Sequence, residues 1–363
     1  TFSAQYIKDD LELLFGGAAN TYDNDHFGEV LWVKTQPQKS FPQEFYRDNS
    51  KKNDINGYVK ASYTFNDQWI LFGDVQLRNV SYKANGDDTG LVDDKFNFFN
   101  PKAGLTYKIN PNSQAYFSYA RAHREPNRTD YESGNPKPEQ LNDFELGYRF
   151  GSEKLALNIN GYYMLYKDQL VLTGALNDVG AAIRENSGNS YRLGIEIDGT
   201  WRFADKWQIN PSVTLSSNKN VDYKAQINGE LVDLGNTNIS FSPNIIVGNA
   251  LTYTPINNLY VSWLSKYVGE QFMGNTDSEA SKLDAYFTND LNISYEIPLK
   301  KWFKSISFNI LANNIFNVKY VSNGYYYTYD DDWSVPESIS TIEGAGYYPQ
   351  AQFNILGGIS LKF

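Results

Sequence analysis

Hydrophobic and polar residues alternate along most of the chain with a period of two. In residues 155–166, Leu155, Leu157, Ile159, Gly161, Tyr163 and Leu165 share one side. In residues 191–203, Leu193, Ile195, Ile197, Trp201 and Phe203 share one side, and Arg192, Glu196, Asp198 and Arg202 share the other. No helical stripe is sustained. Because successive side chains of a strand point to opposite faces, the pattern predicts an all-β chain.

The alternation predicts about fifteen strands, most of them about 10–15 residues long. Strands of soluble sheets are usually about 5–6 residues long, whereas about ten residues suit a tilted strand that crosses a bilayer. The predicted strands are residues 1–7, 10–20, 53–65, 68–82, 97–109, 112–122, 141–150, 154–168, 190–203, 207–219, 243–254, 258–268, 286–297, 305–318 and 351–363.

The connections between these strands alternate between short and long. The short ones lie near 8–10, 65–68, 109–112, 151–154, 204–206, 254–258 and 298–304, and the long ones span 20–52, 83–96, 122–140, 168–189, 219–242, 269–285 and 320–350. Short turns at one rim and long loops at the other are typical of outer-membrane barrels. We therefore predict that residues 1–363 form part of a transmembrane antiparallel β-barrel.

Closure of this barrel needs more strands than the chain supplies. An odd number of strands does not close into the usual even barrel, and an open edge in lipid leaves backbone groups unpaired. We therefore expect further amino-terminal strands in another part of the protein or on another chain. The last strand is predicted to end at the short-turn rim, with Phe363 at the membrane interface.

The amino-acid composition argues against several classes of function. The chain contains 28 Tyr, 22 Phe and 7 Trp, no Cys, two His and a net charge of −10. The negative charge argues against a nucleic-acid partner, and the shortage of Cys and His argues against a structural zinc site. No run of 18 apolar residues predicts a transmembrane helix. No catalytic or phosphate-binding motif is recognisable, so we expect no enzyme activity.

Three stretches resemble TonB-dependent receptors, the active transporters of the bacterial outer membrane. Residues 314–320, NIFNVKY, are similar to the family's Asn-Leu-Phe-Asp-x-x-Tyr, which the family carries on its next-to-last strand. Residues 99–127 look like the family's strand–turn–strand with an aromatic YFSYAR ascent. Pro138, Glu139, Glu145 and Gly147 match its Pro-Glu-x-x-x-x-x-Glu-x-Gly pattern, and HFGEVLW at 26–32 resembles receptors of Bacteroidetes.

The resemblance covers the whole chain as the carboxyl-terminal part of a barrel of about 22 strands. It implies a plug domain and a TonB box outside this chain, and TonB as the partner that drives import. The implied ligand is a scarce metal chelate, namely a ferric siderophore, haem or cobalamin. Outer-membrane lipid, lipopolysaccharide and a surface lipoprotein are further implied partners. The alternatives are a passive porin or structural barrel, a TonB-dependent importer of glycan or peptide, and an outer-membrane hydrolase or adhesin.

The first candidate ligand-binding site lies in residues 120–134. Its members are Arg121, His123, Arg124, Arg128 and Tyr131. Arginine side chains bind carboxylates and other anions with two parallel hydrogen bonds. The alternative is structural: the same cations hold the loop through salt bridges with Glu125, Asp130 and Glu132.

The second candidate site lies in residues 325–338. Tyr326, Tyr327 and Trp333 are candidates for stacking on a planar ligand. Asp330, Asp331 and Asp332 are candidates for calcium, which prefers oxygen ligands. We expect no intrinsic cofactor apart from calcium in such extracellular loops. The alternative is a solvated acidic loop.

Two further sets are assigned to the barrel wall. The aromatic set is expected at the lipid or its interface, and contains Tyr107, Tyr148, Phe150, Trp201, Phe203, Trp263, Tyr295 and Trp302. The inward polar set contains Arg149, Arg192, Glu196, Asp198 and Arg202, and we expect Arg to pair with Asp or Glu across neighbouring strands.

Overall fold

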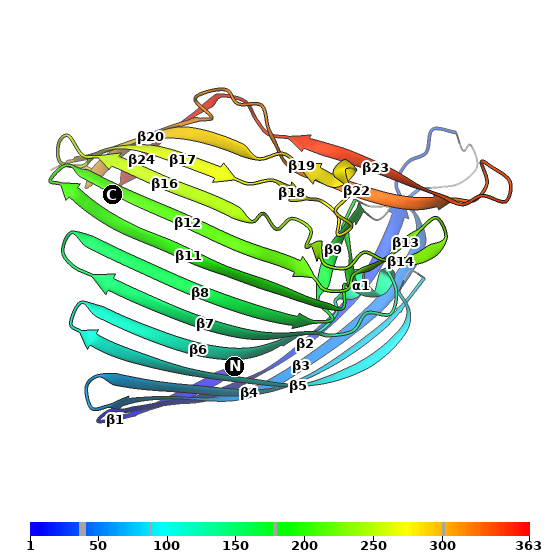
Figure 1. Cartoon of the computed structure of the whole chain (residues 1–363), viewed down its shortest axis with the longest axis horizontal. Helices are drawn as coiled ribbons and strands as arrows, with labels where there is room; N and C mark the ends of the chain where they lie inside the picture. The colour runs from blue at the N-terminus through cyan, green and yellow to red at the C-terminus, as the bar shows by residue number, and fades with distance from the viewer. Residues whose placement is uncertain (36–40, 88, 177–179, 300–301) are drawn as a thin grey trace.

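One large antiparallel sheet dominates the molecule (Figure 1). The computed structural model describes residues 1–35, 41–87, 89–176, 180–299 and 302–363. Strands that follow one another along the path of the sheet are hydrogen-bonded neighbours, from β1 at one edge to β24 at the other. The path consists of β1 (Phe2–Lys8), β2 (Leu11–Val30), β3 (Gln43–Phe65), β4 (Trp69–Gly86), β5 (Gly90–Asn110), β6 (Ser113–Arg124), β7 (Glu139–Gly151), β8 (Leu155–Lys167), β11 (Asn189–Ala204), β12 (Trp207–Asn220), β16 (Ile245–Tyr253), β17 (Leu259–Val268), β20 (Tyr286–Pro298), β21 (Ser305–Asn313) and β24 (Asn354–Lys362). A sixteenth strand, β15 (Thr237–Asn238), pairs with β12 beside this path.

Each of the fifteen predicted strands corresponds to one strand of the path, so the predicted all-β class and antiparallel order are confirmed. The sheet curls like the wall of a barrel (Figure 1). The number of strands in the complete barrel stays a prediction.

The two ends of the sheet differ as predicted (Figure 1). Short turns lie at one end, where the ring of Phe363 packs 4.9 Å from that of Phe303, between centroids. The opposite end carries additional elements. These are the hairpins β9 (Leu170–Leu176)–β10 (Ala182–Asn186), β13 (Lys224–Ile227)–β14 (Glu230–Asp233), β18 (Gln271–Phe272)–β19 (Lys282–Leu283) and β22 (Val321–Asp331)–β23 (Ser340–Pro349), helix α1 (Arg128–Glu132) and the 3-10 helix η1 (Glu279–Ser281).

Two of the predicted long loops are largely strand. Residues assigned to the connections 20–52 and 83–96 extend β2, β3, β4 and β5 well beyond the predicted limits. Polar side chains occur on both faces of these stretches, so the hydrophobic alternation is weak there. Polar pairs link the neighbouring strands. Thr21 donates to Asn53 over 3.0 Å, and Lys83 pairs with Asp93 over 2.9 Å. Parts of the predicted connections 20–52, 83–96, 168–189 and 298–304 lie outside the described residues.

The predicted strand 305–318 ends early, because β21 stops at Asn313. Asn314 and Asn317 have φ values of 48° and 54°, a left-handed conformation that Asn tolerates better than most residues. The Asn314 side chain donates to the Val318 carbonyl over 2.8 Å and accepts from the Val318 amide over 2.9 Å. The segment that resembles the family signature is therefore a turn rather than part of a strand.

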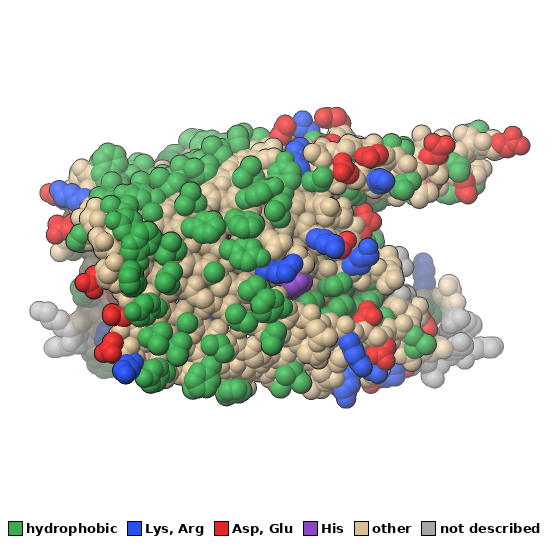
Figure 2. Space-filling model, turned by 60° about the horizontal axis from the view of Figure 1, so that its bottom comes forward, with side chains coloured by type: hydrophobic (Ala, Val, Ile, Leu, Met, Phe, Trp, Pro, Cys, Tyr) green, Lys and Arg blue, Asp and Glu red, His purple; other side chains and the backbone are tan. Residues whose placement is uncertain are grey.

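Apolar side chains share the face predicted from the alternation. Leu193 and Ile195 of β11 lie opposite Tyr163 and Gly161 of β8, and all four line one apolar groove with Ile159. Figure 2 shows hydrophobic side chains spread over the sheet and charged side chains gathered toward its two ends. In the part of the chain that the structure describes, no helix is both long and apolar enough to span a membrane.

The expected pairing with Asp or Glu is wrong for all three arginines of the inward polar set. Among the described residues, Arg149 lies over the ring of Tyr116, with 4.5 Å from Cζ to the centroid. Arg192 donates to Ser242 over 2.9 Å, and Arg202 donates to Gln208 over 3.2 Å. These guanidinium groups remain partly solvated, so neutral partners suffice.

Candidate functional site

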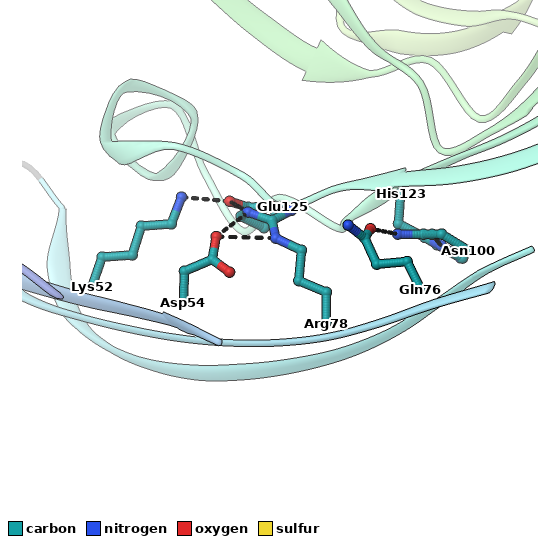
Figure 3. A network of polar contacts seen from close by, with 7 residues as sticks. All are labelled: Lys52, Asp54, Gln76, Arg78, Asn100, His123 and Glu125. Atoms are coloured by element: carbon teal, nitrogen blue, oxygen red, sulfur yellow. Dashed lines mark hydrogen bonds and ion pairs between the residues drawn. The ribbon is translucent and has the colours of Figure 1, made fainter. Parts of the chain in front are cut away.

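A buried carboxylate attaches the segment that follows β6 to the wall of the sheet (Figure 3). Glu125 is 8% exposed and accepts two hydrogen bonds from Arg78 of β4, of 2.7 and 2.8 Å. Lys52 of β3 binds the same carboxylate. Arg78 also donates to Asp54 from Nε over 3.0 Å and from Nη2 over 2.6 Å. Two cations and two carboxylates thus form one network between three segments.

Helix α1 continues this attachment. Asn127 caps the helix: its side chain accepts from the amide of Asp130, whose carboxylate accepts from the amide of Asn127. Arg128 donates to Asp48 of β3 and to Glu132, each over 2.7 Å. Its guanidinium is therefore engaged by two carboxylates and contributes to folding of the segment.

Tyr131 packs α1 onto the extended part of β4 and β5. Its ring stacks on Tyr82 at 5.4 Å between centroids, next to Ala84 and Val92. Its hydroxyl donates to Asp94 over 2.6 Å. Burial, together with Asp94, raises the pKa of Tyr131, so the phenol remains a protonated donor. The structure places Tyr131 in a small core.

The other three predicted residues lie at the end of β6. His123 stacks on Phe98 at 5.0 Å between centroids, and its Nδ1 lies 2.8 Å from Oδ1 of Asn100 (Figure 3). Nε of Arg121 is buried with no hydrogen-bond partner among the described residues, and Arg124 is exposed. Arg121 and Arg124 are thus less engaged than Arg128.

A salt bridge within the loop, the structural alternative to ligand binding, is present between Arg128 and Glu132. Glu125 instead pairs with Lys52 and Arg78, which the sequence did not indicate as partners. Lys52 was assigned to a loop, and Arg78 lies 47 residues from Glu125. Lys52, Asp54 and Arg78 do lie on mutually paired stretches of β3 and β4, but no spacing along the chain signals that Glu125 meets them.

The second predicted site is divided between the two faces of the β22–β23 hairpin. Tyr326 is 3% exposed, packs with Met273 and Leu283, and donates to Glu343 over 2.6 Å. Tyr327 and Trp333 are exposed. Of the three predicted aromatic residues, Tyr327 and Trp333 therefore present accessible rings.

Two of the three predicted aspartates of this hairpin bind different groups. Asp330 accepts from the amide of Gly229 over 3.1 Å, and Asp331 accepts from the amides of Trp333 and Ser334. Among the residues that the structure describes, no three His, Asp or Glu side chains are grouped to hold a metal ion. Calcium at Asp330, Asp331 and Asp332 stays a prediction.

A polar cavity of about 710 Å³ lies between the hairpins of the long-connection end. Tyr223 donates to Glu185 over 3.0 Å, and Tyr326 donates to Glu343, so each carboxylate is held by a phenol. Burial and Glu185 raise the pKa of Tyr223, which keeps its proton. The lining consists of Thr173, Ala175, Glu185, Tyr223, Lys224, Ala225, Gln226, Ile227, Asn228, Leu231, Asn275, Thr276, Tyr326, Tyr327, Thr328, Thr341 and Glu343.

This cavity has the size of small-molecule sites, and its phenols, carboxylates and amides can hydrogen-bond a polar ligand. It brings together the predicted Tyr326 and Tyr327 with residues of five other stretches of the chain. Those residues were missed because the segments lie up to about 170 positions apart and meet only when the hairpins pack.

Comparisons with solved structures identify the same architecture at low sequence identity. The copper transporter OprC matches with a TM-score of 0.74 and 15% identity, covering 99% of this chain and 55% of that one. The ferric-catecholate import receptor Fiu from E. coli K12, in its closed form, matches with a TM-score of 0.69 and 15% identity, covering 99% and 53%. The siderophore receptor PiuA from Acinetobacter baumannii matches with a TM-score of 0.69 and 16% identity, covering 99% and 55%.

This chain spans about half the length of these structures. A search among curated proteins gives no significant match. The family model described as "TonB dependent receptor-like, beta-barrel" matches residues 1–318, which is most of the chain. The chain therefore belongs to the TonB-dependent receptor β-barrel family.

Proposed function

We propose that this chain forms the greater part of the barrel wall of an outer-membrane transporter that captures and imports a metal chelate with energy from TonB. The chelate is a ferric siderophore, haem or cobalamin. The observation that carries the proposal is the family match over residues 1–318. The polar cavity among the long connections supports it, because a receptor needs a binding site at one end of its barrel.

The ligand class is supported by structural neighbours. Neighbours are named as receptors or transporters for ferric catecholate, ferric yersiniabactin, ferric citrate and copper. In the proposed mechanism the cavity and the plug capture the chelate, and TonB then pulls on the plug to open a path. The barrel performs no chemical step, so the proposal includes no catalytic residue.

The wall of the barrel supports an outer-membrane location. Next to the short turns, Trp69 lies 4.4 Å from Tyr107, and Trp207 lies 4.4 Å from Tyr253, between ring centroids. Aromatic girdles of this kind flank the lipid-facing band of outer-membrane barrels. Lipid and lipopolysaccharide are the proposed surroundings, and a surface lipoprotein is a proposed partner.

The ligand-binding roles are assigned to the cavity residue Tyr327 and to the two less engaged cations, Arg121 and Arg124, whereas the buried Tyr326 orients Glu343 in the cavity wall. His123, Arg128, Tyr131 and Trp333 are proposed to position or border the ligand. An anionic chelate would gain from Arg124 because its guanidinium is exposed.

Uptake by cells that carry the whole receptor tests the proposal. Cells with and without functional TonB are given ferric siderophores, haem or cobalamin, and cell-associated metal is measured by mass spectrometry. TonB-dependent uptake of one chelate supports the proposal. TonB-independent uptake would favour a passive porin, and TonB-dependent uptake of only glycans or peptides would assign the other ligand class.

A further inference from the structure

The β22–β23 hairpin has two unlike faces. One face is buried, because Tyr326 packs against Met273 and Leu283. On β22, the residues at alternate positions, Tyr325, Tyr327 and Tyr329, point to the other face. The second face of the hairpin therefore consists largely of aromatic rings.

These rings lie flat against the hairpin. Tyr325 is paired with Gly346 and Tyr327 with Gly344 across the two strands. A β-carbon at Gly346 would lie 2.3 Å from Cζ of Tyr325, and one at Gly344 would lie 2.5 Å from Cζ of Tyr327. Each ring thus covers the backbone of a glycine, and only a residue without a side chain permits this placement.

The rings form a row with accessible faces, called here the aromatic strip (Tyr325, Tyr327, Tyr329 and Trp333). Successive centroids are 6.4, 6.4 and 5.9 Å apart, and the planes differ by 15°, 13° and 7°. Rings at these distances do not cover one another: Tyr327, Tyr329 and Trp333 are 43%, 44% and 69% exposed. Three nearly parallel π-faces are left to solvent, and Tyr325 at the end of the row is half-buried.

The charge around the strip has one sign. Residues 321–349 contain Asp330, Asp331, Asp332, Glu337 and Glu343, and no Lys, Arg or His. Within the described part of the chain, these acids form no ion pair. Their recorded partners are neutral donors such as the Gly229 amide and the Tyr326 hydroxyl. Asp330 and Glu343 lie on the same face as Tyr326, whereas Asp331 is on the face of the strip, and Asp332 and Glu337 lie in the tip of the hairpin. The exposed side and tip of the hairpin therefore carry negative charge.

We propose that the aromatic strip is a docking surface for an extended cationic peptide that carries arginine at alternate positions. Arginine binds aromatic faces through cation–π contacts, and neighbouring carboxylates strengthen its attraction. Alternate side chains of an extended peptide are about 6.6 Å apart on one side, which matches the ring spacing of 6.4 Å. An anionic ligand is disfavoured by the acids. The strip shares Tyr327 and Trp333 with the chelate site proposed above. The inference rests on the geometry and charge of the hairpin and does not depend on that proposal.

Peptide binding to the whole receptor in detergent tests the inference. The probe is a heptapeptide that alternates Arg and Thr, and the comparison ligands are the matching Glu–Thr peptide and a neutral hexasaccharide. Affinity is measured by titration calorimetry at low and at high salt. We expect the Arg peptide to bind at least about tenfold more tightly than either comparison ligand and to weaken as salt increases.

The double variant Tyr327→Ala/Tyr329→Ala deletes the two central rings of the aromatic strip, and both positions are exposed to solvent. We expect its affinity for the Arg peptide to fall about tenfold, since each exposed cation–π contact contributes a few-fold in affinity. Asp332→Asn should lower it further, whereas Tyr22→Ala, an exposed aromatic position on β2, should not. Failure of the Arg peptide to bind, equal binding of the hexasaccharide or the Glu peptide, or unchanged affinity in the double variant would each overturn the inference.

Discussion

At the scale of single residues, Arg78 connects residues 125–132, the segment that contains Glu125 and α1, to the wall of the barrel. Its guanidinium makes two bonds to the buried Glu125 and two to Asp54. Glu125 also has Lys52, so the carboxylate has a second cation if Arg78 is lost. The segment from Glu125 through α1 is therefore held by charge pairs and by Tyr131.

Arg78→Met is expected to loosen this segment. Removal of one partner leaves the Glu125 carboxylate, which is 8% exposed, with incomplete compensation. Hydrogen exchange of residues 125–132 should show a loss of about 2 kcal/mol in the free energy of local opening, less than for a fully buried pair because Lys52 remains. Lys83→Met is the control: it breaks the Lys83–Asp93 pair, whose side chains are both 60% exposed, and should change the opening by less than about 0.5 kcal/mol. Equal effects of the two variants would contradict the role assigned to Arg78.

The stability of the segment at residues 125–132 is expected to depend on pH through the carboxylate of Glu125. Burial raises the pKa of Glu125, but hydrogen bonds from Arg78 and Lys52 outweigh burial and hold the pKa below the ordinary glutamate value of 4.5. A depressed pKa stabilises the attached segment at pH values above 4.5, and this stabilisation is lost as the pH falls through the depressed value. Hydrogen exchange of residues 125–132 should therefore be steady near neutral pH, after correction for intrinsic exchange, and should accelerate below about pH 4.5. In Glu125→Gln this acid transition should be absent. Its persistence in that variant would assign it to another group.

At the scale of elements, the turn after β21 explains why a family-like motif contains two asparagines. Asn314 is 4% exposed, adopts φ of 48°, and bonds both backbone groups of Val318. Asn317 accepts from the amide of Phe353, close to the start of the last strand. The motif thus directs the chain from β21 toward the β22–β23 hairpin and holds the start of β24.

Two substitutions separate the contributions of backbone and side chain at Asn314. Asn314→Ala loses the side-chain bonds and leaves an unfavourable left-handed residue, and we expect a loss of about 2–3 kcal/mol. Asn314→Gly loses the bonds but tolerates the φ angle, so the loss should be about 1 kcal/mol smaller. Urea unfolding of the whole receptor in lipid vesicles measures both, with Asn309→Ala at an exposed position of β21 as the control. If Ala and Gly were equally destabilising, backbone strain would not be part of the explanation.

At the scale of the whole molecule, the sheet has two edges. Among the described residues, β1 pairs only with β2, and β24 pairs only with β21. Edge strands carry unpaired amide and carbonyl groups, which are costly in lipid and promote association in water. We therefore expect further strands to pair with both edges in the whole receptor.

Residues 1–363 produced alone should not form a monomeric barrel. We expect aggregates after refolding into detergent, whereas the whole receptor should give a compact species that migrates differently in unheated and heated electrophoresis samples. Adding the remaining strands as a separate chain should restore that compact species. A stable, heat-modifiable monomer of residues 1–363 alone would show that the two edges can close on each other.

The sequence by itself determined the fold class, the order of the strands and the end at which the large connections gather. These follow from a period of two and from connection lengths, which are local properties of the chain. The sequence-based prediction was wrong at two places. The polar stretches of β2 to β5 were predicted as loops but are paired strand, and the strand predicted to continue to residue 318 ends before Asn314.

The tertiary structure alone decided which predicted site residues remain available to a ligand. Arg128 and Tyr131 are engaged in attaching α1, Tyr326 is buried, and Glu125 meets Arg78 from 47 positions away. The physical reason is that a side chain's role depends on the charges and surfaces that packing brings beside it. Residue type and spacing along one segment do not contain the position of a partner on another strand or hairpin.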